Sequence, residues 1–292
     1  MGTVHAQFGI AGSGRIACAL GRLLLDRGAG PAIIAARDAA RASAAANFIG
    51  ASGAVGLEEL AGLTDRIFIA VSDDAIEEVA GRIAVSCRPG AVVLHASGAR
   101  GIEVLDPLAG AGAECGALHP LATVPSPEAG LRTLPGAPFG FTGPAGARTW
   151  ASSIVQALGG ELFDVPAGGR ALYHAAAVLA CNSIPGLLDA ASEMLAAAGA
   201  APTREAALRL LEPIVRSSVE NTFKLGPQAA LTGPARRGDA ATLQSHLAAL
   251  ACLNPSIGRL YRAQAARLIE LARQAGLDPD RAQIIEEALS NE

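Results

Sequence analysis

The sequence has few aromatic residues, few charges and no excess of positive charge. Aromatic side chains make up 3% of its 292 residues and charged side chains 17%, and the formal net charge at pH 7 is -4. Proteins that hold nucleic acid or an anionic membrane surface through electrostatics carry a positively charged face, which this composition does not supply. We therefore expect neither nucleic acid nor a membrane as a partner.

Cysteines are few and scattered, and they form no Cys-x-x-Cys pair. The sequence thus predicts neither a disulfide framework nor a metal site. The five are Cys18, Cys87, Cys115, Cys181 and Cys252. No apolar run nears the roughly 20 residues that span a bilayer, and residues 1–7 hold no basic stretch followed by an apolar core. These absences favour a cytoplasmic protein.

What the chain does contain is alternating β-type and helical patterns in its first half. From Ala6 to about Val165 the alternation predicts a parallel sheet covered by helices on both faces. Strands are expected at 6–11, 32–35, 66–71, 91–95, 116–119, 138–141 and 161–165, and helices at 14–27, 39–48, 74–85 and 145–158.

Beyond residue 167 no further β-type run appears, and long Ala/Leu-rich segments continue to the end of the sequence. Asn254-Pro255 and Asp278-Pro279 each offer an N-cap side chain followed by proline at the first helical position. The expected fold class is α/β: a doubly wound parallel sheet in residues 1–167, followed by an all-α domain in residues 168–292.

A glycine-rich turn closes the first predicted strand and opens the first predicted helix. Gly12-Ser13-Gly14 is followed by Arg15-Ile16-Ala17, which gives Gly-x-Gly-x-x-Ala. Gly12 permits a tight turn, Gly14 lets the backbone approach a pyrophosphate, and the N-H groups at the helix start face the anion. We therefore expect a dinucleotide on Gly12, Ser13, Gly14, Arg15 and Ile16.

The end of the second predicted strand indicates which dinucleotide is bound. Sites selective for NAD place a carboxylate there, whereas this chain places Arg37, whose guanidinium can pair with a 2′-phosphate. NADP(H) is therefore the expected cofactor. Asp38 leaves NAD as an alternative, and Arg37 could instead be a solvated residue that begins the next helix.

Two further strand ends are expected to border the cofactor. The backbone of Val71 and Ser72 follows one strand, while Asp73 or Asp74 is expected to cap the next helix rather than to contact ligand. Ser97 follows a neighbouring strand and is a candidate hydrogen-bond donor to nicotinamide or substrate.

His119 is the expected acid-base residue. A hydride exchanged with nicotinamide must be matched by a proton at the substrate oxygen or nitrogen, and imidazole titrates near neutrality. His119 ends a predicted strand, as does His95, which is the weaker candidate. The alternative is that His119-Pro120 only ends a strand and bonds to backbone.

In the helical domain, His174 and Asn182 are the polar groups of an Ala-rich segment, two turns apart. Pro185 cannot donate an N-H to the carbonyl of Cys181, so the helix is expected to be disturbed beside Asn182. The pair could orient substrate in a cleft between the two domains, or Asn182 could bond to a neighbouring helix.

A turn-rich segment, 231–239, interrupts the helices. Arg237 is a candidate clamp for a substrate carboxylate, although a surface salt bridge would explain it equally well. Asp239 is expected to cap the helix that follows.

With these residues assembled, the chain resembles a family of Rossmann-like proteins that carry a helical C-terminal domain of unclassified function. The matching elements are the Gly12-Ser13-Gly14 loop, His95-Ala96-Ser97-Gly98, His119-Pro120-Leu121, Tyr173-His174 with Asn182, and 230–239. In architecture the family is similar to the 6-phosphogluconate dehydrogenase-like superfamily, which includes ketopantoate reductases, pyrroline-5-carboxylate reductases and β-hydroxyacid dehydrogenases. The resemblance implies an NADP-dependent oxidoreductase that dimerises through its helical domain.

Two single motifs can be compared with particular members of this superfamily. His119-Pro120-Leu121 resembles a His-Pro-Met segment of prephenate dehydrogenases, whose His contacts the substrate hydroxyl, which supports His119. Asn182 can match an Asn of β-hydroxyacid dehydrogenases, but Val178 stands where those enzymes place Lys.

Two functions follow as hypotheses. The first is an NADP-dependent oxidoreductase acting on a small carboxylate-bearing ketone or imine, with His119, Asn182, His174 and Arg237 as site residues. The second is a protein that binds NADP(H) without catalysis and reports redox state to a partner.

Overall fold

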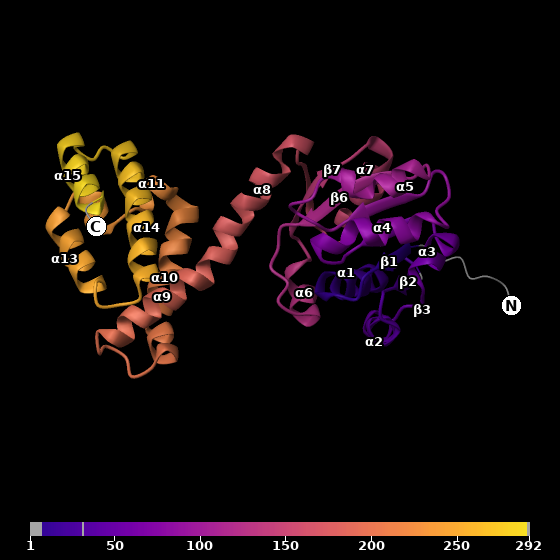
Figure 1. The fold of residues 1–292 in the computed structure, drawn as a ribbon, viewed down its shortest axis with the longest axis horizontal. Helices are drawn as coiled ribbons and strands as arrows, with labels where there is room; N and C mark the ends of the chain where they lie inside the picture. The colour runs from indigo at the N-terminus through magenta and orange to yellow at the C-terminus, as the bar shows by residue number, and fades with distance from the viewer. Residues whose placement is uncertain (1–7, 31, 291–292) are drawn as a thin grey trace. The chain divides into compact units, whose positions relative to one another are not determined.

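The computed structural model describes residues 8–30 and 32–290 (Figure 1). Ala6 and Gln7, where the first strand was expected to begin, lie outside the described residues. Contacts between residues divide the chain into two compact units, one ending at Asn182 and the other beginning at Ser183. The domain boundary was predicted at residue 168, at the start of a helical stretch that runs over 167–197. The division between the two units falls within this stretch.

The first unit is built on an eight-stranded sheet with the order β3-β2-β1-β4-β5-β6-β7-β8. The strands are β1 (Phe8–Ala11), β2 (Ala32–Ala35), β3 (Gly53–Val55), β4 (Arg66–Ile69), β5 (Val92–His95), β6 (Glu114–Pro120), β7 (Pro138–Thr142) and β8 (Glu161–Asp164). Because the chain runs outward from β1 to β3 and then returns to β4 beside β1, the order reverses there. Ligands of such sheets bind at this reversal, beyond the carboxyl ends of the strands.

Helices cover both faces of the sheet, as expected. One hydrophobic cluster packs α1 (Arg15–Asp26), α2 (Ala39–Ile49) and α7 (Ala145–Ala157) on one face. The other packs α3 (Leu57–Leu63), α4 (Ile76–Ala84) and α5 (Asp106–Gly110) on the opposite face. The alternation of strand side chains explains this: Phe68 of β4 joins the first cluster while its neighbours Ile67 and Ile69 join the second.

The sheet departs from the prediction at one pairing. β6 and β7 run antiparallel, with His119 opposite Gly140, whereas all other pairs in the sheet of the described chain are parallel. The connection between them carries α6 (Pro127–Thr133), which packs on α1. The short β3 and helices α3, α5 and α6 were not predicted, because each is too brief to show a period.

The second unit is helical and has a core of its own. Its helices are α9 (Ser183–Ala197), α10 (Arg204–Leu225), α11 (Pro227–Ala230), α12 (Gly233–Arg237), α13 (Ala240–Leu250), α14 (Pro255–Gln274) and α15 (Pro279–Ser290). Leu243, Ile269 and Ile285 are buried together at the centre of this core. The predicted N-caps are confirmed, since Asp239 accepts from Thr242 N–H at 3.1 Å and Asn254 and Asp278 bind the starts of α14 and α15.

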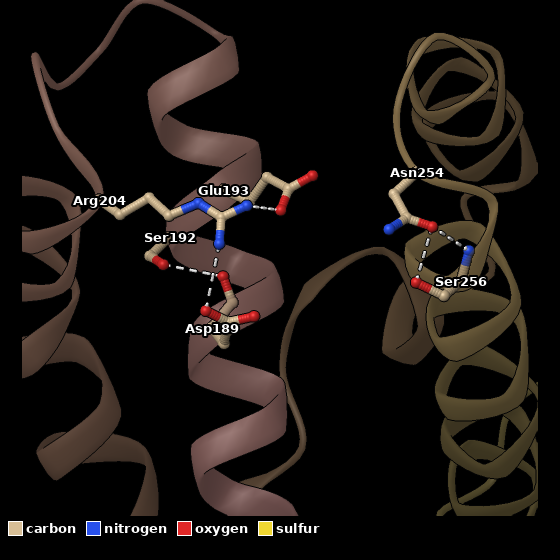
Figure 2. A network of polar contacts seen from close by, with 6 residues as sticks. All are labelled: Asp189, Ser192, Glu193, Arg204, Asn254 and Ser256. Carbon is tan, nitrogen blue, oxygen red and sulfur yellow. Dashed lines mark hydrogen bonds and ion pairs between the residues drawn. The ribbon is translucent and has the colours of Figure 1, made fainter.

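A polar network ties the start of α10 to α9 (Figure 2). The guanidinium of Arg204 pairs with Glu193 and lies 3.4 Å from Oδ1 of Asp189. Ser192 Oγ in turn donates to the Asp189 carbonyl at 2.8 Å. The connection between α9 and α10 is therefore held by charge-assisted bonds as well as by packing.

The helical segment around Asn182 is disturbed as Pro185 predicts. α8 (Arg170–Ala177) passes into a π turn (Val178–Asn182) before α9 begins. A π turn widens the hydrogen-bond spacing, and this accommodates the missing N–H of the proline. By length and composition alone, the stretch 167–197 would also be apolar enough to span a membrane, with mean hydropathy 1.4, which the sequence reasoning did not anticipate.

Candidate functional site

The glycine-rich turn has the backbone that was expected of it. Gly12 has a φ of 130°, and an added Cβ would lie 2.2 Å from the carbonyl oxygen of Ala70. Its N–H donates to the Ala35 carbonyl at 2.8 Å, so the turn is fixed to both neighbouring strands. Only glycine fits at this position.

The start of α1 is open to an anion. Gly14 is the N-cap residue and brings no side chain to the helix end, and the first turn contains no acidic residue. An added Cβ at Gly14 would meet only the Ala70 oxygen, at 3.9 Å, so the backbone at the start of the helix is not crowded by neighbouring side chains. Ala17 is fully buried and permits the close helix packing. These residues fit a pyrophosphate.

The end of β2 carries cations, and its one carboxylate is engaged. Asp38 Oδ1 accepts from Arg41 N–H at 2.8 Å and thereby caps α2. Arg37 is exposed and lies 3.6 Å from Glu78, a loose pair. Arg41, which sequence reasoning missed, lines a small pocket together with Ser13. Arg37 precedes the N-cap of α2 and Arg41 lies in its first turn, four positions later, a spacing that could have been noticed in the sequence.

The segment after β4 behaves differently from the prediction. Ser72 is the N-cap residue of a 3-10 turn, Asp73–Ala75, and the backbone N-cap of α4 is Ala75. Neither aspartate occupies an N-cap position, so the expected capping role for Asp73 or Asp74 is wrong: they lie within the first turn instead. Val71 lies near Gly12, with its Cγ1 3.2 Å from where a Cβ on Gly12 would be.

A cluster of polar rings forms at the carboxyl end of β6. His119 Nδ1 lies 2.7 Å from the hydroxyl oxygen of Tyr173. The rings of Tyr173 and His174, from α8, meet the His119 ring edge to face, with centroids 5.6 and 5.9 Å apart. The structure thus brings His119 and His174 together, as two predicted site residues, and adds Tyr173 as their neighbour.

Two glycines make room for this cluster. An added Cβ at Gly98 would lie 2.6 Å from His174 Nδ1 and 2.9 Å from His119 Nε2. An added Cβ at Gly140 would lie 2.9 Å from the Tyr173 hydroxyl. Both imidazoles therefore pack directly on backbone, and His174 Nδ1 is buried without a hydrogen-bond partner among the residues that the structure describes.

Arg170, which sequence reasoning missed, holds the cluster in place. Its side chain is 2% exposed. The guanidinium donates to the Arg100 carbonyl at 2.7 Å, to Thr142 Oγ1 at 2.9 Å and to the Ser97 carbonyl. Arg170, Tyr173 and His174 follow the i, i+3, i+4 spacing of one helix face, which was the available signal.

His95 and Ser97 have mainly structural roles. His95 is fully buried, its Nδ1 accepts from Ser97 N–H at 3.2 Å, and its Nε2 lies 3.0 Å from the Gly101 carbonyl. Ser97 Oγ accepts from the N–H groups of Ala99 and Arg100. Contact between Ser97 and nicotinamide stays a prediction.

Burial and the Arg170 cation shift the pKa values of His119, His95 and Tyr173. Burial, then the charges of His174 and Arg170, lower the pKa of His119 to about 4. Burial, then Arg170, lower the pKa of His95 to about 4 as well. Burial raises the pKa of Tyr173, against the opposing effect of Arg170. At neutral pH both histidines are therefore uncharged beside a permanent cation.

Two predicted site residues are not brought to this cluster. Asn182 is exposed at the end of the π turn, two helical turns from His174. Arg237 ends α12 in the second unit, where its guanidinium lies 3.9 Å from Asp239. Their roles toward substrate stay predictions.

The fold and the glycine-rich turn define a Rossmann-like unit followed by a helical unit. Residues 3–120 match the family model of a Rossmann-like domain, and residues 137–268 match that of a domain of unknown function, DUF2520. The chain therefore belongs to the proteins that join a Rossmann-like domain to a DUF2520 domain, which confirms the resemblance drawn from the sequence.

Solved structures share this fold at low identity. A protein of Bacteroides fragilis, provisionally assigned as an NADP oxidoreductase, is 23% identical, with a TM-score of 0.75 over 91% of this chain and 98% of that one. An imine reductase of Myxococcus stipitatus in complex with NADP+ is 17% identical, with a TM-score of 0.63 over 98% and 100%. A reductive aminase of Aspergillus terreus is 17% identical, with a TM-score of 0.59 over 98% and 93%. No curated protein matches the sequence.

The buried histidines make stability depend on pH. Both have a pKa of about 4 in the folded chain against an ordinary value of 6.5, so the unfolded chain binds more protons between these pH values. The free energy of unfolding, measured by denaturant titration, should have its full value above pH 6.5. It should fall as the pH drops toward about 5, by up to about 1.4 kcal/mol per pH unit for each histidine.

Variants separate this effect from other titrations. His119→Gln should remove about half of the pH dependence, whereas replacement of the exposed His246 by Gln should leave it unchanged. An unfolding free energy that stays constant over this pH window would contradict the burial of neutral histidines.

Proposed function

We propose that the protein is an NADP(H)-dependent oxidoreductase that reduces a small carboxylate-bearing ketone or imine. The observation that carries the proposal is the polar cluster of His119, Tyr173 and His174, on the same sheet edge as the glycine-rich turn. β1, β4, β5 and β6 run parallel, so the segments that follow them share one edge. A dinucleotide on Gly12 and Gly14 would extend along this edge.

The residues at the start of α1 would hold the pyrophosphate, and Arg37 and Arg41 would hold a 2′-phosphate. When bound, the dinucleotide supplies a hydride. The chain must then deliver a proton to the substrate heteroatom. We assign this role to His119, and the proposal is supported by its Nδ1 contact with Tyr173, which leaves Nε2 for the substrate. Arg237 remains the proposed clamp for a substrate carboxylate, and Asn182 a proposed contact.

The arrangement of the cluster favours an enzyme over a non-catalytic NADP(H) sensor. Burying a cation and two imidazoles costs stability unless their polar atoms are paired, and His174 Nδ1 is left unpaired within the described chain. A domain that only reports redox state has no need of such a cluster, whereas a proton-transfer site does.

The cofactor preference can be tested through its two arginines. Arg37→Ala and Arg41→Ala should each weaken NADPH binding about tenfold, because each removes a charge-assisted bond worth about 1.4 kcal/mol. NADH binding should change little. Isothermal titration calorimetry measures both, with Arg22→Ala as a control, since Arg22 pairs with Asp26 on the far part of α1. Equal losses for the two cofactors would contradict the assignment.

The activity can be tested by NADPH oxidation across 2-keto acids, ketopantoate and cyclic imines. His119→Ala should lower turnover about a hundredfold, as expected for a general acid, and should leave the dissociation constant for NADPH unchanged. His246→Ala is the matched control. Activity on no member of the panel would favour the sensor, and full activity of His119→Ala would refute the role of His119.

We also propose that the protein forms a homodimer through its helical unit. The support is the set of large apolar side chains that α10 exposes, among them Leu210, Ile214 and Phe223, of which Phe223 is 89% exposed. Exposed apolar faces of this kind mark protein contacts. The apolar stretch 167–197 includes Arg170, Tyr173 and His174 near its start, and these residues contact the sheet. We therefore propose that the exposed apolar side chains of this stretch contact protein rather than lipid.

Analytical ultracentrifugation tests the dimer. The protein should sediment with the mass of two 29.3 kDa chains, and Phe223→Asp should shift it toward one chain because a buried charge weakens an apolar interface. Arg216→Gln, on the same helix, should have no effect. A wild-type protein with the mass of one chain would reject the proposal.

A further inference from the structure

The hydrogen bond between His119 and Tyr173 suggests a function for the tyrosine that rests on the proposed reductase activity. We propose that Tyr173 donates its hydroxyl proton to Nδ1 of His119, which places the His119 proton on Nε2, and that it replaces this proton as His119 protonates the oxygen of a carbonyl substrate. Tyr173 is thus a positioning and relay residue that acts through His119.

The geometry supports a direct and well-defined bond. The 2.7 Å contact between Nδ1 and the phenol oxygen joins residues 54 positions apart in the sequence. The oxygen rests on Gly140, where a Cβ would be 2.9 Å away, and Gly140 pairs with His119 across β6 and β7. Phe163 packs edge to face against the Tyr173 ring, with centroids 5.9 Å apart. The phenol therefore has little freedom to turn away.

The direction of the bond follows from the available acceptors. Burial keeps His119 uncharged at neutral pH, so its ring carries one proton, on either Nδ1 or Nε2. If Nδ1 held it, the phenol O–H would need a different acceptor, and the structure describes none for Tyr173. With the phenol as donor, Nδ1 accepts and Nε2 carries the proton. The raised pKa of Tyr173, which burial causes against the opposing effect of Arg170, keeps the phenol protonated and so able to donate at neutral pH.

The relay explains how an uncharged histidine can act as an acid. Loss of the Nε2 proton alone would leave an imidazolate, which is too basic to form near neutral pH. If Nδ1 takes the Tyr173 proton in the same step, His119 stays neutral and the negative charge appears on the phenol oxygen. Burial raises the pKa of Tyr173, and the field of Arg170 opposes that rise, so the negative charge on the phenol oxygen forms beside a cation.

The step is balanced in atoms and electrons. As hydride from the reduced nicotinamide dinucleotide reaches the carbonyl carbon, the electron pair of the C=O π bond moves to oxygen. This oxygen binds the proton from Nε2, Nδ1 binds the proton from the Tyr173 hydroxyl, and the tyrosinate takes a proton from water. The substrate gains two hydrogens, and the oxidised dinucleotide accounts for the electrons.

The charges around His119 also indicate the class of substrate. The groups that act on it are Arg170 and His174 from α8, and Asp73 from the turn after β4. Asp73 forms no hydrogen bond with His119 in the described structure, whereas the buried cation Arg170 is fixed to three acceptors. A positive field stabilises the oxyanion that forms on a carbonyl and disfavours a cationic iminium. We therefore assign a ketone or aldehyde rather than an imine.

The chain contains its own matched control. His246 Nδ1 lies 2.7 Å from the hydroxyl of Tyr261, with ring centroids 5.8 Å apart, but this second pair lies in the helical unit and His246 is exposed. Tyr173 and Tyr261 are the two tyrosines of the sequence. Tyr173→Phe and Tyr261→Phe thus remove the same bond at two different sites.

The first readout is the protonation state of His119 in the ligand-free protein, measured by nitrogen-15 NMR of the imidazoles with His119→Gln to assign the signal. The wild type should show a neutral His119 with its proton on Nε2 at pH 7. Tyr173→Phe should redistribute the proton between Nδ1 and Nε2, while Tyr261→Phe should leave it unchanged. A proton on Nδ1 in the wild type, or a charged ring at pH 6, would overturn the proposal.

The second readout is turnover of the ketones on the panel that the wild type reduces. Tyr173→Phe should lower kcat at least tenfold with an unchanged dissociation constant for NADPH, and the loss should be smaller for cyclic imines. Unchanged ketone turnover would overturn the relay while the proposed reductase activity stands. No activity on any ketone would overturn that activity and the relay step together, whereas the NMR result on the hydrogen bond holds independently.

Discussion

The buried guanidinium of Arg170 is the interaction on which the candidate site depends. A cation at 2% exposure is costly unless its donors are paired, and here two carbonyls and a hydroxyl from two different strand ends pair with it. These bonds fix the first turn of α8 to the loop after β5 and to β7. Tyr173 and His174, on the next turn, are thereby positioned over His119. Burial, with this charge adding to it, lowers the pKa of His119 and His95, while the charge opposes the rise that burial causes in the pKa of Tyr173.

Glycines provide the space for this arrangement, because they carry no side chain. Gly98 and Gly140 let imidazole and phenol rings touch backbone, and Gly12 lets the phosphate turn lie against Ala70. The antiparallel pairing of β6 with β7 places Gly140 opposite His119 and so delivers the phenol oxygen to Nδ1. The polar cluster thus depends on one buried cation, two glycines and one reversed strand.

The features that could be predicted from the sequence are those that depend on neighbouring residues along the chain. Buried apolar runs identified most strands, and the glycine spacing identified the tight turn between β1 and α1. β3 was missed because Gly53–Val55 is three residues long and only partly buried. The reversal of β7 could not be foreseen, because strand direction is set by packing between distant segments.

The site was only partly predictable for the same reason. His119 and His174 were singled out by residue type, but Tyr173 was quoted only as part of a motif, and Arg170 was overlooked as a lone charge at the start of an Ala-rich helix. Their contacts span 54 to 73 positions of sequence. Asn182 and Arg237 were chosen by the same local reasoning, and their roles toward substrate stay predictions.

The account is tested most directly by an experimental structure of the protein with NADPH bound. It predicts that the nicotinamide ring lies at the carboxyl end of β6 beside Nε2 of His119, with Arg170 still bonded to the carbonyls of Ser97 and Arg100. A nicotinamide bound away from His119, or Arg170 turned out to solvent, would contradict it.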